Sequence, residues 1–183
     1  MAGMPTTPPN RHVGITLVEV IVCVCVLSIS AAIALPSMAP LVERQRAISA
    51  GNALLTQLAM TRMAAITHRS HAALCPSTNS LTCNAGTDWS GGWLLFLDRD
   101  GNRRPDNVGD ILHADNTPPS RHLRLTSSTG RHQVRYLPDG RSAGTNLTIA
   151  ICNRKGELLS SVIVNTAGRA RNSRPAHSTT CPY

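Results

Sequence analysis

The sequence predicts an α+β protein, in which one long N-terminal helix precedes a domain of antiparallel strands. Residues 13–35 are apolar almost without interruption, and apolar residues continue at helical spacing to about residue 68. After Cys75 the pattern changes to short alternating runs separated by turn residues. We therefore expect a helical part over residues 15–68 and a globular, β-rich part over residues 69–183.

The apolar run of residues 13–35 contains a single charged residue, Glu19. About 20 apolar residues span a hydrocarbon core of roughly 30 Å, so a membrane segment is expected here. A carboxylate in lipid costs roughly 2.5–3.5 kcal/mol on insertion scales, and Glu19 therefore needs an explanation. A cleaved secretory signal could end at Ala32-Ile33-Ala34, but the run is long for a signal and includes the acid. A plain membrane anchor leaves Glu19 unexplained.

Beyond residue 35 the helical pattern continues as one apolar stripe that is expected to pack on a sheet. The stripe consists of Ile48, Leu55, Ala59, Met63 and Ile66. Gln57, Thr61 and His68 fall on another face of the same helix. Pro36 and Pro40 are expected to bend the helix, because proline removes a backbone donor and clashes with the preceding turn.

Strands are expected where apolar residues alternate or run together between turn signals. The candidate segments are residues 92–97, 122–125, 133–136, 147–151 and 158–164. Turns are indicated at Thr129-Gly130, Pro138-Asp139-Gly140 and Ala167-Gly168. Such a succession of short strands favours antiparallel pairing.

The cysteines of the globular part indicate disulfides in an oxidising compartment. Cys75, Cys83, Cys152 and Cys181 lie there, whereas Cys23 and Cys25 lie in the apolar run. Pairing Cys75 with Cys83 and Cys152 with Cys181 is the local choice among three connectivities, and the sequence does not force it.

The sequence shows no pattern typical of an enzyme. It lacks nucleophile signatures, a glycine-rich phosphate loop and paired metal ligands, so we expect no catalytic residues, no cofactor and no metal. Asp98 to Asp106 offers oxygens at calcium-like spacing, but Arg103 and Gly109 occupy positions where an EF-hand needs glycine and glutamate. A hairpin turn explains this segment better. Trp89 and Trp93 are expected to be core residues.

Charge is distributed unevenly along the globular part. Residues 37–120 hold seven basic and seven acidic residues, whereas residues 121–183 hold ten basic residues and two acids, Asp139 and Glu157. This asymmetry indicates a polyanionic partner. A basic surface without any partner would show the same charge.

The segment Gly14-Ile15-Thr16-Leu17-Val18-Glu19 resembles the processing site of type IV pilins and the related pseudopilins. The resemblance implies a leader peptide over residues 1–14, cleavage by prepilin peptidase between Gly14 and Ile15, and methylation of the new N-terminus. The family's usual first residue is Phe, from which Ile15 departs. The resemblance also implies that residues 15–35 serve as the transmembrane and assembly segment. Glu19 would then pair in the filament with the α-amino group of a neighbouring subunit, which explains a carboxylate among apolar helices.

The strand region resembles the FimT/FimU and GspH group of minor pilins and pseudopilins. The similarity lies in "DWSGGWLLFLDRDG", "VRYLPDGRSAG" and "VIVNTAGRARNSR". It implies the type IV pilin fold, a single-pass inner-membrane protein with a periplasmic globular domain, and incorporation into a surface pilus. The implied partners are other major and minor pilins.

Gly168-Arg169-Ala170-Arg171 resembles the Gly-Arg-x-Arg motif of FimT-type pilins that bind DNA in natural transformation. On an extended segment Arg169 and Arg171 point the same way, and an arginine fork suits a phosphate. Arg174, and Arg141 in the other Gly-Arg turn, complete the predicted site. Aromatic residues for base stacking are scarce, so the expected contact is with the backbone of duplex DNA, independent of sequence. The alternative is a structural minor pilin, or a GspH-like pseudopilin that primes assembly.

Overall fold

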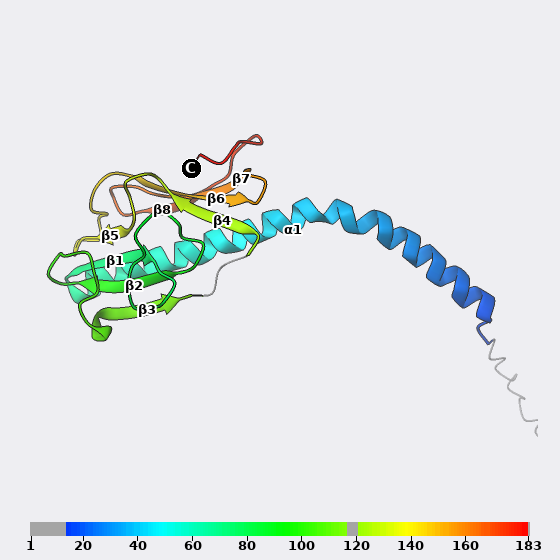
Figure 1. Cartoon of the computed structure of the whole chain (residues 1–183), viewed down its shortest axis with the longest axis horizontal. Coiled ribbons are helices and arrows are strands. Elements are labelled where there is room, and N and C mark those ends of the chain that lie inside the picture. The colour runs from blue at the N-terminus through cyan, green and yellow to red at the C-terminus, as the bar shows by residue number, and fades with distance from the viewer. Residues whose placement is uncertain (1–13, 117–120, 183) are drawn as a thin grey trace, which may run out of the picture. The chain divides into compact units, whose positions relative to one another are not determined.

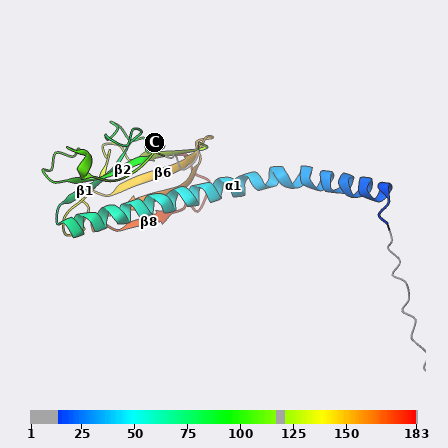
Figure 2. The same cartoon turned by 90° about the horizontal axis from the view of Figure 1, so that it is seen from below.

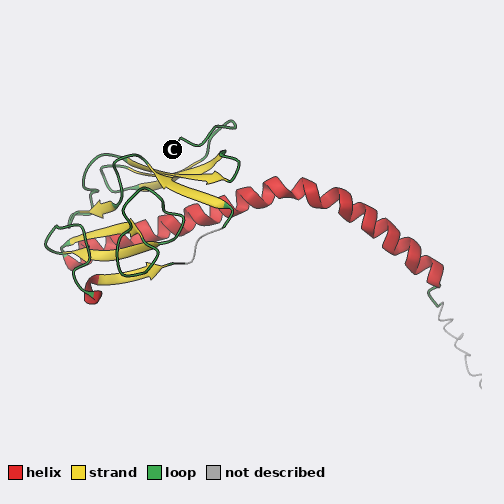
Figure 3. Ribbon diagram, in the orientation of Figure 1, coloured by secondary structure: helices red, strands yellow, loops and turns green. Residues whose placement is uncertain are grey.

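The computed structural model describes residues 14–116 and 121–182, and the predicted α+β architecture is confirmed (Figures 1 and 3). Helix α1 (Leu17–His68) is followed by β1 (His71–Pro76), β2 (Trp93–Asp98), the 3-10 turn η1 (Val108–Asp110) and β3 (Ile111–Asp115). The remaining strands are β4 (Leu123–Ser127), β5 (Val134–Tyr136), β6 (Leu147–Asn153), β7 (Leu158–Val164) and β8 (Ala170–Ser173). The chain divides into two compact units, Met1–Pro40 and Leu41–Tyr183. The predicted leader, residues 1–14, lies outside the described residues except for Gly14.

In the first unit, α1 begins directly after a capping threonine. The backbone N–H of Glu19 donates to Thr16 Oγ1 at 3.3 Å, which satisfies one of the free donors of the first turn. The apolar side chains that follow are exposed all around the helix, for example Leu17 at 76% and Leu27 at 68%. Such a surface needs an apolar environment or other helices to cover it.

No single helix of the described residues combines the length and hydropathy expected of a membrane span. The helical stretches Leu17–Ile33 and Met38–His68 reach the length and apolar composition of a membrane span only when the two are counted together.

In the second unit, the described strands form two four-stranded sheets, and every neighbouring pair is antiparallel. The first sheet has the order β3-β2-β1-β5 and the second has the order β4-β6-β7-β8. Residues 41–68 of α1 lie along the sheets, which Figure 2 shows from below. One apolar core joins this helix to both sheets, and it contains Trp89, Trp93 and Tyr136. The two tryptophans are core residues, as predicted.

The helix face that packs on the sheets is not the one the sequence predicted. The buried helix residues are Ala47, Ala50, Gly51, Leu54, Gln57, Leu58, Thr61 and Ala65. Ala59 and Ile66 are exposed instead, and Met63 is 62% exposed. Small residues dominate the buried face because they allow the helix backbone to approach the strands. Thr61 tolerates burial because its hydroxyl donates to the carbonyl of Gln57 at 2.7 Å.

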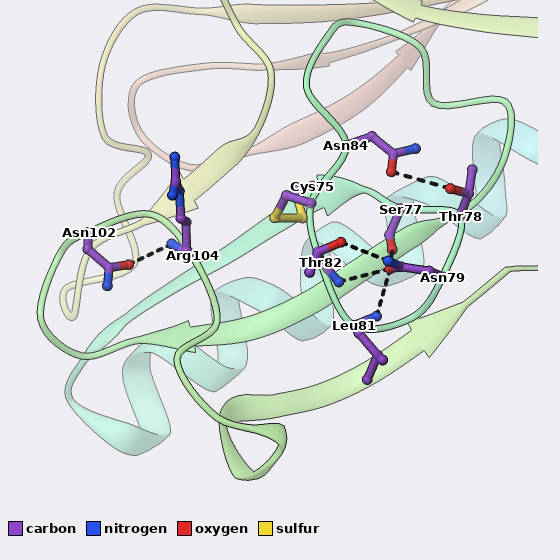
Figure 4. Close-up of a disulfide and its surroundings, with 10 residues drawn as sticks. Cys75, Ser77, Thr78, Asn79, Leu81, Thr82, Asn84, Asn102 and Arg104 are labelled. Carbon is purple, nitrogen blue, oxygen red and sulfur yellow. Dashed lines mark hydrogen bonds between the residues drawn. A yellow bond between two sulfur atoms is a disulfide. The ribbon is translucent and has the colours of Figure 1, made fainter.

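The outer face of the first sheet is covered by the loop between β1 and β2. A disulfide joins Cys75 to Cys83 and closes this loop. Within it, Asn79 Oδ1 accepts from the backbone N–H groups of Leu81 and Thr82, at 3.0 and 2.9 Å (Figure 4). The loop therefore carries its own hydrogen bonds and shields a second apolar cluster around Phe96.

Candidate nucleic-acid interface

β8, an edge strand of the second sheet, carries half of the predicted Gly-Arg-x-Arg motif. Ala170 packs against the apolar core and Asn172 lies against α1. Arg169 and Arg171 are exposed. Because side chains alternate along a strand, Arg171 lies on the face of β8 turned away from the helix, and Arg169 immediately precedes the strand. Their role in binding stays a prediction.

A tight turn over residues 165–169 positions the first arginine. The Gly168 N–H donates to the Asn165 carbonyl at 2.9 Å, and the Asn165 N–H donates to the Arg169 carbonyl at 3.0 Å. The Asn165 side-chain oxygen also accepts from the Arg169 N–H at 2.8 Å. Gly168 has a φ of +76°, a conformation that side chains disfavour. Glycine therefore fixes the point at which the chain turns into β8 and exposes Arg169.

The second Gly-Arg turn, residues 137–141, is built in the same way and touches the first. The Gly140 N–H donates to the Leu137 carbonyl and the Leu137 N–H to the Arg141 carbonyl, both at 2.8 Å. Gly140 and Gly168 are both buried, and a Cβ on Gly168 would overlap the carbonyl oxygen of Gly140. The structure thereby brings Arg141 and Arg169, which are 28 positions apart in the sequence, onto adjacent turns.

Arg141 is partly neutralised by its own turn. Its Nε lies 2.6 Å from Asp139 Oδ2, and its backbone N–H donates to Oδ1 of the same carboxylate at 2.9 Å. These contacts, the backbone hydrogen bond first, lower the pKa of Asp139. Both side chains are exposed, so this ion pair is weak and can exchange for another anion.

Arg174 follows β8 at the start of the C-terminal tail. The disulfide between Cys152 and Cys181 ties this tail back to the second sheet. The Leu158 N–H donates to the Thr179 carbonyl at 2.8 Å, which adds a backbone contact to the tail. The locally preferred pairing of the cysteines is therefore the one found in the structure.

The arginines of the motif lack intramolecular counter-charges. Over residues 14–116 and 121–182, the ion pairs are Arg99–Asp110, Arg135–Asp98 and Arg141–Asp139. Arg169, Arg171 and Arg174 are thus cations without a carboxylate partner in this range. We call Gly168, Arg169, Arg171, Arg174 and Arg141 together the arginine face.

Sequence reasoning missed a second group of basic residues. Arg103, Arg131, His132 and Arg135 line a cleft of about 370 Å³ in the same unit. Arg103 belongs to the segment that is neutral by sequence count, but in space it joins residues of the basic segment. Counting charge along the chain hid this group, because its members come from the loop after β2 and from the residues around the start of β5.

The predicted processing and assembly residues lie at the start of the first unit. Gly14 and Ile15 precede α1, and both are exposed. Glu19 lies in the first helical turn and is also exposed. The structure makes these residues accessible, and their roles remain predictions.

The fold and the segment order define a pilin-like protein, and the comparisons with known proteins agree. Over 163 residues the chain is 27% identical to the pilin-like protein PilA1 of Thermus thermophilus, covering 86% of this chain and 96% of the relative. The crystal structure of the type IV minor pilin FimU of Pseudomonas aeruginosa is similar at a TM-score of 0.59. That match has 18% identity and covers 79% of this chain and 100% of FimU. A second crystal form of FimU gives a TM-score of 0.53 at 16% identity, covering 74% of this chain and 98% of that one.

The family is shown by a direct match. The model of the type II transport protein GspH matches residues 50–168, and the chain therefore belongs to the GspH family. The type IV pilin fold predicted from the sequence is confirmed, and so is membership of the GspH group. The match ends at Gly168, so most of the arginine face lies at its edge or beyond it.

Proposed function

We propose that this protein is a minor type IV pilin that binds DNA without sequence preference, for DNA uptake in natural transformation. The arginine face is the proposed binding site. The observation that carries the proposal is the exposure of Arg169, just before the edge strand β8, and of Arg171 within it, with no carboxylate partner for either in the described chain.

The geometry suits a phosphate backbone. Residues two apart on a strand are separated by about 7 Å along it, which allows two arginines to meet successive phosphates of one DNA strand. Arginine donates in a planar fork that matches a phosphate in two-point contact. β8 is the last strand of the described sheet, and its outer edge is not paired with another strand of that sheet. A ligand can therefore approach the arginines from the side.

The protein is proposed to reach this role through the family's assembly route. Residues 1–14 are removed by prepilin peptidase, the mature chain is held in the inner membrane by its N-terminal helix, and other pilins contact that helix in the filament. The exposed apolar side chains from Ile15 to Ile33 support this assignment, because they need a cover.

The test is fluorescence anisotropy with unrelated duplexes, using the full chain in detergent. Arg169→Gln with Arg171→Gln should weaken binding to all sequences alike and flatten the logarithmic salt dependence by roughly two units. The matched control is Arg44→Gln with Arg104→Gln, which changes the charge equally at two exposed arginines outside the arginine face. Equal weakening by both pairs would mean that diffuse charge binds DNA and that the arginine face is no site.

The alternative function is purely structural, as a minor pilin or GspH-like pseudopilin that primes assembly. The exposed apolar side chains of Met60, Met63 and Ile66 favour a subunit contact along α1. If the unaltered protein fails to bind duplex DNA at low salt, while its loss still abolishes filament formation, the structural role is the correct one.

A further inference from the structure

The cleft near β5 combines three guanidinium groups with little negative charge. Arg103, Arg131 and Arg135 line it together with His132. Within the described chain, the carboxylate in contact with this group is Asp98, which is fully buried and 3.3 Å from Arg135 Nη1. Asp98 also accepts from the backbone N–H of Arg103 at 3.0 Å. Both carboxylate oxygens are therefore engaged, and two of the three arginines lack an ion-pair partner there.

Arg131 is held in place by neutral acceptors. Its Nη2 donates to the Ala143 carbonyl at 3.1 Å and its Nη1 to Thr145 Oγ1 at 3.3 Å. Burial, followed by the charge of Arg103, lowers the pKa of Arg131. Like charges thus face one another without an anion between them. The repulsion between Arg103 and Arg131 raises the free energy of the empty cleft, and an anion bound there would lower it.

Arg103 occupies a backbone conformation that few residues adopt. Its φ is +68°, in the left-handed region, and the hydrogen bond from its N–H to Asp98 secures it there. Strained backbone held by buried contacts is often found at binding sites. Its side chain is exposed and lines the cleft.

The cleft and the arginine face are linked through the short segment of residues 140–143. The Ala143 N–H donates to the Arg135 carbonyl at 2.8 Å, so both sides of this hairpin border the cleft. Arg141 lies two residues before Ala143, about 7 Å away by strand rise. Gly140, next to Arg141, contacts Gly168. The backbone therefore places Arg141 close to both the cleft and the turn that carries Arg169.

We propose that Arg103, Arg131 and Arg135 form a second phosphate-binding site, which takes a backbone phosphate of the same DNA that contacts the arginine face. This proposal rests on the proposed function. A backbone phosphodiester suits the cleft because each of its two non-bridging oxygens can accept from an arginine. The link to Arg141 and Arg169 also favours a ligand with regularly repeated charges.

The experiment compares two neighbouring arginines in the full chain in detergent. Arg103→Gln removes a cleft charge, whereas Arg104→Gln removes an exposed charge from a residue that does not line the cleft. We expect Arg103→Gln to weaken duplex binding about fivefold at low salt and to flatten the salt dependence by about one unit. Arg104→Gln should leave both quantities nearly unchanged, and Arg103→Lys should restore part of the affinity.

Each result separates the second site from the arginine face. If Arg169→Gln with Arg171→Gln weakens binding but Arg103→Gln behaves like Arg104→Gln, the cleft proposal is overturned and the proposed function stands. If only Arg103→Gln weakens binding, the cleft binds DNA and the arginine face does not. If the unaltered protein binds no DNA, both proposals are overturned. Thermal unfolding of each variant checks that a lost affinity reflects a lost contact and not a damaged fold.

Discussion

At the residue scale, the candidate interface depends on which arginines have a counter-charge of their own. Arg169 and Arg171 have none in the described chain, whereas Arg141 is paired at 2.6 Å with Asp139. In the proposed function, a DNA phosphate that accepts from Nε of Arg141 must displace this carboxylate. We therefore expect Asp139 to limit the affinity of the arginine face, both by competing for Arg141 and by repelling phosphate.

This competition leads to a prediction for Asp139→Asn. The substituted side chain keeps the oxygen that accepts from the Arg141 N–H, so the turn should be preserved. Removing the negative charge frees the Arg141 guanidinium, and DNA affinity should rise about two- to fivefold at low salt. Anisotropy titration measures this change.

Asp88→Asn provides the matched control. Asp88 also accepts from the backbone N–H two residues ahead, at 2.9 Å, but it lies in the loop before β2. The two variants have identical net charge. If both raise the affinity equally, the gain comes from overall charge and the Asp139–Arg141 pair does not limit binding.

Glycine at residues 140 and 168 shows how much of the site depends on backbone geometry. The Gly-Arg turns were predicted from the sequence, and the exposure of Arg169 and Arg171 is compatible with the predicted site. Their mutual contact could not be predicted, because it depends on how the turns after β5 and β7 meet in space. The cleft around Arg103 was missed for the same reason: its arginines are far apart in the sequence and become neighbours only through the sheet.

At the element scale, the boundaries of elements were predictable where patterns were strong. The helix ends at His68, and β7 covers the same residues as the predicted strand 158–164. β1 and β3 were missed, since β1 carries two alanines and β3 mixes polar with apolar residues. The packing face of α1 was predicted wrongly because the stripe was drawn through residues such as Met63, which is exposed. The buried face combines Leu54 and Leu58 with small residues such as Ala50 and Ala65.

The two disulfides close loops of very different length, which allows a prediction about stability. The bridge Cys152–Cys181 spans 29 residues and Cys75–Cys83 spans 8. In the loop-entropy model the longer loop stabilises by roughly 3–4 kcal/mol and the shorter by about 2–3 kcal/mol. Replacing both cysteines of the longer loop by alanine should therefore lower the free energy of unfolding more than the same change at Cys75 and Cys83.

Denaturant unfolding of the two double variants measures this difference. Peptide mapping without reduction should first find Cys152 joined to Cys181 in the unaltered chain. Free thiols at both positions, or a larger loss from the shorter loop, would contradict the expected ranking. The longer bridge also holds the tail that contains Arg174, so its removal should weaken DNA binding as well as stability.

At the scale of the whole molecule, the chain combines a unit that is apolar on its surface with a unit that has its own core. In the first unit, residues 14–33 and 38–40 are all exposed, Ile15, Leu17 and Val18 among them. The second unit has an apolar core shared by the helix and both sheets. The apolar surface of the first unit needs a cover, whereas the second unit buries its own apolar residues.

Glu19 lies in the apolar helix of the first unit, and its proposed pairing in the filament gives the last prediction. Glu19→Ala should still be inserted in the membrane and cleaved between Gly14 and Ile15, because the leader and the apolar run are unchanged. Entry into filaments should fall strongly, since the α-amino group of the neighbouring subunit loses the carboxylate that compensates it in an apolar bundle.

Intact mass of the membrane-extracted protein reports the cleavage, and immunoblots of sheared filaments report incorporation. Glu19→Gln separates charge from hydrogen bonding and should be nearly as defective. Normal incorporation of both variants would refute the pairing, and a mature chain that begins at Leu35 would refute the processing site.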